Sequence, residues 1–327
     1  VVDEASVSVL SSESEQPETR TSTATGTSRM VRIITMSVCL CAARDKGPAH
    51  RRCAWHAEAV EVEPLSASIG AVVPDVRLAE LDRDGIEQVR HLVHEHEVIF
   101  FRDQQLDDDQ HLAVAQSLGP VRVFPIAALF GATEPAVTPI VDTPDEPPVA
   151  DNWHTDVTWI AEPPDYAMLR SVVAPASGGD TMWASLTAAY DALSEPFRSL
   201  LDGLRVVHDN TSFLEGVKKK VAPEVYEEHG LDRIRTLYPP VTHPLIRTHP
   251  ATGVNAYYDG GGTMGVPDGL TEAEWTPLCA LLHAMFDEPK RQVRWRWSEG
   301  DVAVWDERLV VHRGVGDHFP PRRVVRR

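Results

Sequence analysis

The stretch Asn152-Trp153-His154-Thr155-Asp156-Val157-Thr158 places an imidazole and a carboxylate one residue apart, at His154 and Asp156. In an extended segment, residues i and i+2 point to the same face, so both side chains can approach one small ion. A third ligand is available far downstream at His312, in the run WDERLVVH at residues 305–312. Two imidazoles and one carboxylate on one face of an ion leave its opposite positions open, as expected for a non-haem Fe(II) oxygenase. The sequence therefore predicts a metal site formed by His154, Asp156 and His312.

A His-x-Asp pair is weak when it stands alone, because the chain has 14 His and 49 acidic residues and chance pairs are common. Two further features accompany this pair. A Gly-Gly-Asp-Thr run ends at Thr181, and Arg323 and Arg327 follow His312. Several motifs in a fixed order are more specific than any one of them.

From about Val60 to Arg327 this set resembles the taurine dioxygenase (TauD/TfdA) family of Fe(II)- and 2-oxoglutarate-dependent dioxygenases. The runs that carry the resemblance are DNWHTDVTW (151–159), GGDTMWAS (178–185), HPLIRTHPATG (243–253), VRWRW (293–297) and GDVAVWDER (300–308). Many short strands separated by turns, with peripheral helices, favour a mainly β sandwich or jelly roll. The resemblance implies a double-stranded β-helix with the metal at its open end.

The resemblance also implies roles for three downstream side chains. Arg323 falls where the family places the arginine that binds the far carboxylate of 2-oxoglutarate, and a partly buried bidentate pair of this kind is strong. Thr181 matches the family hydroxyl that hydrogen-bonds the same carboxylate. Arg327 falls where the sulfonate-using members place a second arginine on the substrate anion. Alternatively, the arginines among the last six residues form a solvated basic end: Arg322, Arg323, Arg326 and Arg327.

The expected substrate pocket differs from that of the taurine-using members. Phe124 stands where they carry a His, Ala127 where they carry a Tyr, and Val149-Ala150 where they carry an Asp-Asn pair. The pocket is therefore more apolar, which disfavours taurine and favours an alkyl sulfate, an alkyl sulfonate or a specialised metabolite. Glu307 replaces the Asn of the usual Trp-Asp-Asn-Arg run, and we expect only a local effect.

The composition limits the class of partner. The formal net charge of −18 argues against nucleic acid or an anionic membrane, because both require basic patches. Three of the four cysteines, Cys39, Cys41 and Cys53, precede the body of the chain, which contains only Cys279. No disulfide framework is then possible in the body, which fits a cytoplasmic protein. The pair at 39 and 41 has no second pair at zinc spacing, and we predict that it binds no metal.

The N-terminal part is expected to lie outside the folded domain. Residues 1–29 are rich in Ser, Thr and Glu and lack aliphatic periodicity, which indicates disorder. Residues 30–57 include a short apolar run that is either a secretory h-region or part of a leader with no folded role. We expect residues 1–57 to be a disordered or non-conforming leader and 58–327 to form the dioxygenase domain. The family chain continues past the second arginine, so this domain is expected to lack its last strand.

Hydrophobic periodicity predicts the main elements. Helices are expected at 82–94, 107–118 and 271–286, and strands at 98–101, 166–173, 181–183, 204–208 and 293–297. The strand at 302–305 is expected to deliver His312. Residues 211–240 are expected to form a charged, mobile insertion, a region that acts as a lid in the family. The histidines at 91, 94, 243 and 249 are predicted to be structural, the last two because each precedes a proline and so favours extended backbone.

Two alternatives to a dioxygenase remain at this point. One is a metal-binding β-helix protein without turnover. The other is a zinc hydrolase that uses the same three ligands, against which Thr181 and Arg323 argue. The partner is expected to be a small molecule, with Fe(II) as cofactor, 2-oxoglutarate and O2 as cosubstrates, and a dimer or tetramer as the assembly.

Overall fold

The computed structural model describes residues 60–129, 132–145, 148, 151–218 and 233–327. The predicted leader, including Cys39 and Cys41, lies outside the described residues, as do residues 149–150 and most of the expected insertion. The described residues belong to one compact unit that spans Arg52–Arg327. No helix among them is long and apolar enough to cross a membrane.

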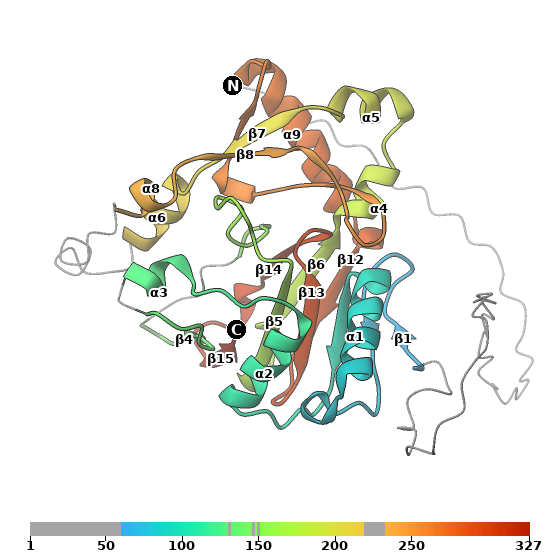
Figure 1. The fold of residues 1–327 in the computed structure, drawn as a ribbon, viewed down its shortest axis with the longest axis vertical. Helices are drawn as coiled ribbons and strands as arrows, with labels where there is room; N and C mark the ends of the chain where they lie inside the picture. Colours follow the sequence, from blue (N-terminus) through green and yellow to red (C-terminus); the bar gives the residue numbers. More distant parts are fainter. Residues whose placement is uncertain (1–59, 130–131, 146–147, 149–150, 219–232) are drawn as a thin grey trace, which may run out of the picture. The chain divides into compact units, whose positions relative to one another are not determined.

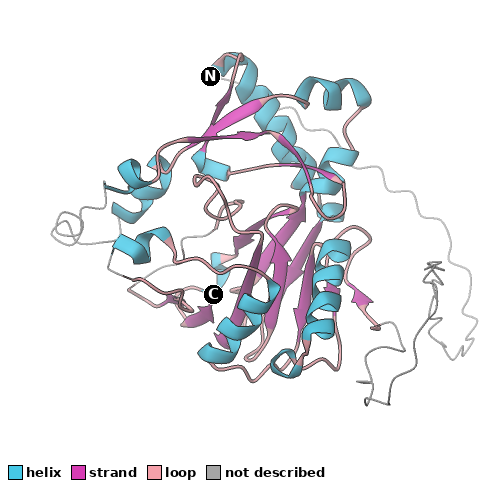
Figure 2. Ribbon diagram, viewed as in Figure 1, coloured by secondary structure: helices cyan, strands magenta, loops and turns pink. Residues whose placement is uncertain are grey.

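The largest sheet has seven strands and is antiparallel except for one parallel pair. Figures 1 and 2 show its long central strands running side by side. Its strand order is β1 (Glu63–Pro64), β2 (Ala71–Val72), β3 (Val98–Phe101), β13 (Val302–Asp306), β5 (Tyr166–Val173), β15 (Arg323–Arg326) and β4 (Pro139–Asp142). The central strand β13 is buried at every position. A strand with both faces covered requires a continuous apolar run, and the run Val302 to Trp305 supplies one.

A second sheet of three antiparallel strands has the order β12 (Gln292–Trp295), β6 (Thr181–Ser185) and β14 (Val310–Gly314). A third sheet, also of three strands, contains β11 (Met264–Pro267), β7 (Arg205–His208) and β8 (Val241–Pro244). A two-stranded sheet pairs β10 (Asn255–Tyr257) with β9 (Ile246–Thr248). His312 lies on β14, whose described partner is β6. The prediction that the 302–305 strand delivers this histidine is therefore wrong, because a turn at 307–309 separates β13 from β14.

The helices lie at the periphery (Figure 2). They are α1 (Arg83–His96), α2 (Asp108–Leu118), α3 (Pro125–Leu129), α4 (Leu186–Asp191), α5 (Glu195–Leu201), α6 (Thr211–Lys218), α8 (Arg233–Leu237) and α9 (Glu272–Phe286). Asp82 caps α1, and Asp107 forms a capping box with Gln110 at the start of α2. The two flanks of the predicted insertion are thus helical, at α6 and α8.

The core lies on both faces of the β3–β13 pair. On one face the Phe100 ring stacks on Trp295 with 4.1 Å between centroids and meets Trp183 edge-on at 5.2 Å. Trp305 of β13 also meets Trp183 of β6, so the seven-stranded sheet and the β12–β6–β14 sheet pack face to face through aromatic rings. On the other face, Phe101 and the alternate residues of β13 belong to an apolar cluster with α1 and α2. This packing fixes the end of β13, from which the turn leads into the strand of His312.

Candidate active site

Two histidines that are far apart in the sequence meet across an isolated antiparallel bridge. The backbone N–H of His154 donates to the carbonyl oxygen of His312 over 3.0 Å, and the reverse bond measures 2.9 Å. Directly opposed residues project their side chains to the same face. The two imidazole centroids accordingly lie 4.4 Å apart.

Asp156 completes a group of three ligand atoms. Its Oδ1 lies 3.7 Å from His154 Nε2, and its Oδ2 lies 3.6 Å from His312 Nε2. These separations are too long for good hydrogen bonds but suit atoms that surround one metal ion at about 2.0–2.2 Å. The Asp156 side chain is 9% exposed and that of His154 is 23% exposed. The group therefore opens to solvent on the His154 side.

The side chains of this group are oriented by neighbouring atoms. His154 Nδ1 lies 2.8 Å from the carbonyl oxygen of Asn152, to which it must donate, so its Nε2 keeps a free lone pair. Such a bond on the second ring nitrogen is typical of metal-binding histidines. The backbone N–H of Asp156 donates to Glu307 Oε2 over 3.2 Å, and Glu307 Oε1 accepts from Trp305 Nε1 over 2.9 Å. The donor set and its supports fit a divalent metal ion.

Electrostatics favour the protonation states of His312 and Asp156 that a metal requires. Burial, reinforced by His154, lowers the pKa of His312 to about 3, which leaves this imidazole neutral at pH 7. Burial opposes ionisation of Asp156, but Arg327 and the two histidines outweigh it and hold the pKa of that carboxyl below its usual range. A neutral imidazole and an ionised carboxylate are the forms that coordinate a cation.

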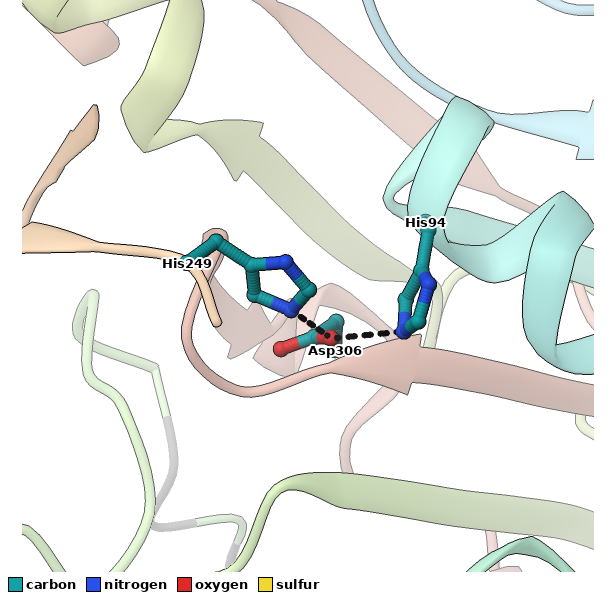
Figure 3. Close-up of side chains that lie close together, drawn as sticks. All are labelled: His94, His249 and Asp306. Carbon is teal, nitrogen blue, oxygen red and sulfur yellow. Dashed lines mark hydrogen bonds and ion pairs between the residues drawn. The ribbon is translucent and has the colours of Figure 1, made fainter. Parts of the chain in front are cut away.

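Figure 3 shows a second group of possible ligands, formed by His94, His249 and Asp306. His249 Nε2 lies 3.1 Å from Asp306 Oδ2, and His94 Nε2 lies 3.8 Å from the same oxygen. Arg308 also binds both oxygens of this carboxylate, with its Nε 2.8 Å from Oδ1. His94 Nε2 lies 2.6 Å from the Tyr166 hydroxyl. Because Arg308 neutralises the carboxylate, we assign this group to an ion-pair network, in agreement with the structural role predicted for both histidines.

Arg323 and Thr181, both singled out in the sequence, are in contact. Arg323 is 8% exposed, and its Nη2 donates to Thr181 Oγ1 over 3.3 Å while its Nε donates to the carbonyl oxygen of Gly179 over 2.8 Å. Thr181 Oγ1 also accepts from Trp297 Nε1 over 2.9 Å. Two N–H donors occupy the acceptor positions of this hydroxyl, so its own proton is available to a further acceptor such as a carboxylate.

A small cavity opens beside this guanidinium. It is lined by Ile140, Asp142, Pro148, Gly314, Val315, His318 and Arg323. Asp142 Oδ2 lies 3.5 Å from Arg323 Nη1 and 3.4 Å from His318 Nε2. Sequence analysis assigned no role to Asp142 or His318, because neither lies in a recognisable motif and only the pairing of β4 with β15 brings the carboxylate here.

Arg327 reaches the metal-ligand group. Its Nη2 forms an ion pair with Asp156 Oδ2, and its side chain is 30% exposed. The backbone N–H of Arg327 donates to the carbonyl oxygen of Thr138 over 3.0 Å, and the reverse bond measures 2.8 Å. A cation is therefore held beside the three ligands, where an anionic group could meet it.

Phe124 belongs to an aromatic cluster near the turn that follows Asp156. Its ring meets that of Phe213 edge-on at 6.3 Å, and Phe213 lies 5.4 Å from Trp159. Trp159 is 2% exposed and packs with Leu214 and Ile234. The cluster presents apolar surface next to the stretch that carries His154 and Asp156.

Comparisons with known proteins give one consistent result. Residues 61–327 match the family model described as taurine catabolism dioxygenase TauD, TfdA family. An α-ketoglutarate-dependent sulfate ester dioxygenase of Pseudomonas putida is 37% identical over 274 residues, which cover 83% of this chain and 89% of that protein. An alkylsulfatase of Acinetobacter baylyi is 32% identical, with 82% and 84% of the two chains covered.

A 2,4-dichlorophenoxyacetate dioxygenase of Cupriavidus pinatubonensis, also α-ketoglutarate-dependent, is 33% identical and covers 82% of this chain and 96% of its own. Among solved structures, a taurine dioxygenase from Burkholderia xenovorans superposes with a TM-score of 0.65 at 32% identity, and the match covers 82% of this chain and 89% of that one. Sequence, site and fold thus agree, and the chain belongs to the TauD/TfdA family of dioxygenases.

Proposed function

We propose that this chain catalyses the Fe(II)- and 2-oxoglutarate-dependent hydroxylation of a small organic substrate that carries a sulfate ester or a sulfonate. The observation that carries the proposal is the meeting of His154 Nε2, the Asp156 carboxylate and His312 Nε2 within 4.8 Å of one another, beside Arg327. The relatives named for sulfate esters and alkyl sulfates support this substrate class.

Fe(II) would be held by His154, Asp156 and His312, which leaves open positions for a chelating cosubstrate and for oxygen. When bound, the metal would supply the activation of O2 that accompanies oxidative decarboxylation of 2-oxoglutarate. The residues of the chain hold the ligands in place: Asn152 fixes the ring of His154, and Glu307 fixes the backbone of Asp156.

The far carboxylate of 2-oxoglutarate would bind Arg323 and the free hydroxyl proton of Thr181. The strand register supports this placement, because His312 is paired with Trp183 and Thr181 with Gly314, two residues farther along the same pair of strands. At about 3.3 Å per residue this offset is roughly 7 Å. A five-carbon dicarboxylate can bridge such a distance with its keto-acid end toward the three ligands.

The substrate would present its anion to Arg327 and its alkyl part to the apolar cluster around Phe124. Arginine suits a sulfate or sulfonate because its planar donors match tetrahedral oxyanions. The Phe124–Phe213–Trp159 cluster favours a hydrocarbon chain over the amine of taurine. A dioxygenase that acts on a specialised metabolite of similar polarity is the alternative within the same reaction class.

In the proposed reaction, O2 supplies both oxygen atoms that are incorporated. One oxygen atom enters succinate as 2-oxoglutarate loses CO2, and the other enters a C–H bond of the substrate. Hydroxylation at the carbon that bears a sulfate ester gives an unstable product, which collapses to an aldehyde and sulfate. We further propose that the seven-stranded sheet and the β12–β6–β14 sheet form the double-stranded β-helix of the family, and that the protein is a cytoplasmic dimer or tetramer.

The test is anaerobic titration of the protein with Fe(II) and then 2-oxoglutarate, followed through the visible charge-transfer band of a chelated keto acid. The unaltered protein is expected to show the band, and His154→Ala is expected to lose it. Arg323→Ala is expected to need at least tenfold more 2-oxoglutarate to reach the same band intensity. Succinate release under air with alkyl sulfates, alkyl sulfonates and taurine then identifies the substrate class. Binding of Fe(II) without a band would leave a metal-binding protein without turnover as the function.

A further inference from the structure

The turn that follows the carboxylate ligand is strained. Val157, next to Asp156, has a φ of 52°, in the left-handed region. A β-branched side chain rarely adopts this conformation because its Cβ crowds the backbone. Such a conformation persists only where the surrounding structure imposes it, and such residues cluster at functional sites.

His243 holds this turn from the neighbouring strand β8. It lies on β8, is 7% exposed, and its Nε2 lies 2.9 Å from the carbonyl oxygen of Thr158 and 3.2 Å from that of Ile160. Both partners are acceptors, so Nε2 must carry the proton and donate to both. One imidazole thus binds the two carbonyls that follow Val157.

Other contacts hold the same turn. The Thr158 hydroxyl lies 2.8 Å from Thr263 Oγ1, which itself donates to the carbonyl oxygen of Gly260. A Cβ at Gly260 would come within 2.7 Å of the Thr158 hydroxyl and 2.5 Å of His208 Nδ1, so only glycine permits this approach. These contacts leave the turn little conformational freedom.

We propose that His243 is a positioning residue for the metal centre. Its imidazole clamps the backbone after Val157 and so fixes the direction of the Asp156 carboxylate. The inference rests on the proposed function in one respect only, namely that Asp156 binds the metal. If His243 served the packing of the β7–β8 strand pair alone, its removal would change folding stability without changing the affinity for a metal.

The experiment measures Mn(II) affinity by electron paramagnetic resonance in the full chain, with thermal unfolding recorded for each variant. His243→Leu is expected to weaken Mn(II) binding by about 10- to 100-fold, as outer partners of metal ligands commonly do. His243→Gln, whose amide can donate from a similar position, should recover most of the affinity. His111→Leu is the matched control, because His111 is 2% exposed and lies on α2.

A second comparison keeps the proposal testable if His243→Leu folds poorly. Glycine adopts a positive φ without strain, so in a Val157→Gly background the turn needs less support. The proposal requires His243→Asn, a polar change whose shorter side chain cannot reach both carbonyls, to cost a smaller factor in Mn(II) affinity in that background than in the unaltered chain. Equal costs in the two backgrounds, or unchanged affinity in a folded His243→Leu variant, would overturn it.

Mn(II) separates this inference from the proposed function. If Mn(II) binds and its affinity depends on His243, but no charge-transfer band forms with Fe(II) and 2-oxoglutarate, the positioning role of His243 is supported and the dioxygenase function is rejected. If the chain bound no metal through His154 and His312, both the positioning role of His243 and the dioxygenase function would be rejected.

Discussion

Arg323 Nη2 donates a hydrogen bond to Thr181 Oγ1, and the same hydroxyl accepts from Trp297 Nε1. The contact joins the start of β15 in the large sheet to the start of β6 in the second sheet. It therefore places the Thr181 hydroxyl against Arg323, which is one of the residues that line the small cavity.

Thr181→Val is expected to weaken 2-oxoglutarate binding while Fe(II) binding stays unchanged. The change keeps the shape of the side chain but removes a hydrogen bond to a charged group, worth about 1.5–3 kcal/mol, which corresponds to roughly 10- to 100-fold in affinity. The measurement is the 2-oxoglutarate dependence of the anaerobic charge-transfer band. Thr248→Val is the control, because Thr248 is exposed on β9. Equal 2-oxoglutarate affinities in both variants would remove Thr181 from the site.

We expect only the group of His154, Asp156 and His312 to bind a metal, and not the group of His94, His249 and Asp306. His312→Ala is expected to abolish Fe(II) binding at micromolar concentrations, because it removes one of three ligands. His94→Leu is expected to leave one Fe(II) per chain bound, because Arg308 already satisfies Asp306. Equilibrium dialysis with metal analysis gives both stoichiometries. Two ions in the unaltered chain, reduced to one by His94→Leu, would contradict our assignment of the second group.

A side chain at Gly179 is expected to weaken cosubstrate binding as well as to strain the backbone. Its φ is +70°, and a Cβ there would lie 3.0 Å from Arg323 Cδ and 3.1 Å from His318 Cγ. Gly179→Ala should therefore displace the guanidinium and raise the KM for 2-oxoglutarate by about tenfold, a change of roughly 1.4 kcal/mol.

Gly203 provides the matched control for this change. Its φ is +86° and nothing lies within 4 Å of a Cβ built there. Gly203→Ala should cost about 1–2 kcal/mol of folding stability from left-handed strain alone, with an unchanged KM. A similar rise of KM in both variants would show that backbone strain, and not contact with Arg323, causes the effect.

The sequence brought His154, Asp156 and His312 together as one candidate site because the three residues lie in short motifs of unusual composition, and the structure places them within 4.8 Å of one another. It did not predict which strand carries His312, because the turn between β13 and β14 is Glu307-Arg308-Leu309, without glycine, proline or asparagine. It also gave no signal for Asp142, which reaches Arg323 only through the pairing of β4 with β15.

His243 illustrates a different limit of sequence analysis. Its position before a proline predicted extended structure, and β8 confirms this. The contact with the turn after Asp156 depends on tertiary packing between segments that are far apart in the chain, and no local pattern encodes it. Residues that act through such contacts can be found only once the fold is known.

Glu97 is expected to make the folding stability depend on pH. Burial raises the pKa of its carboxyl to about 8, although Thr187 and Ser185 donate to its Oε1. Between the unfolded pKa near 4.5 and the folded pKa near 8, the folded state holds a proton that the unfolded state has lost. Stability contributed by the neutral carboxyl is therefore greatest below pH 4.5 and falls as pH rises through 8.

Glu97→Gln should remove this dependence, because the amide keeps an oxygen for both hydroxyl donors and cannot ionise. At pH 5 the two proteins should have similar free energies of unfolding. At pH 8.5 the variant should be more stable by at least about 1.4 kcal/mol, the equivalent of one pKa unit. Urea denaturation across this pH range measures the difference. A constant difference between the two proteins from pH 5 to 8.5 would mean that Glu97 is already ionised in the folded protein, and that Ser185 and Thr187 stabilise its charge against burial.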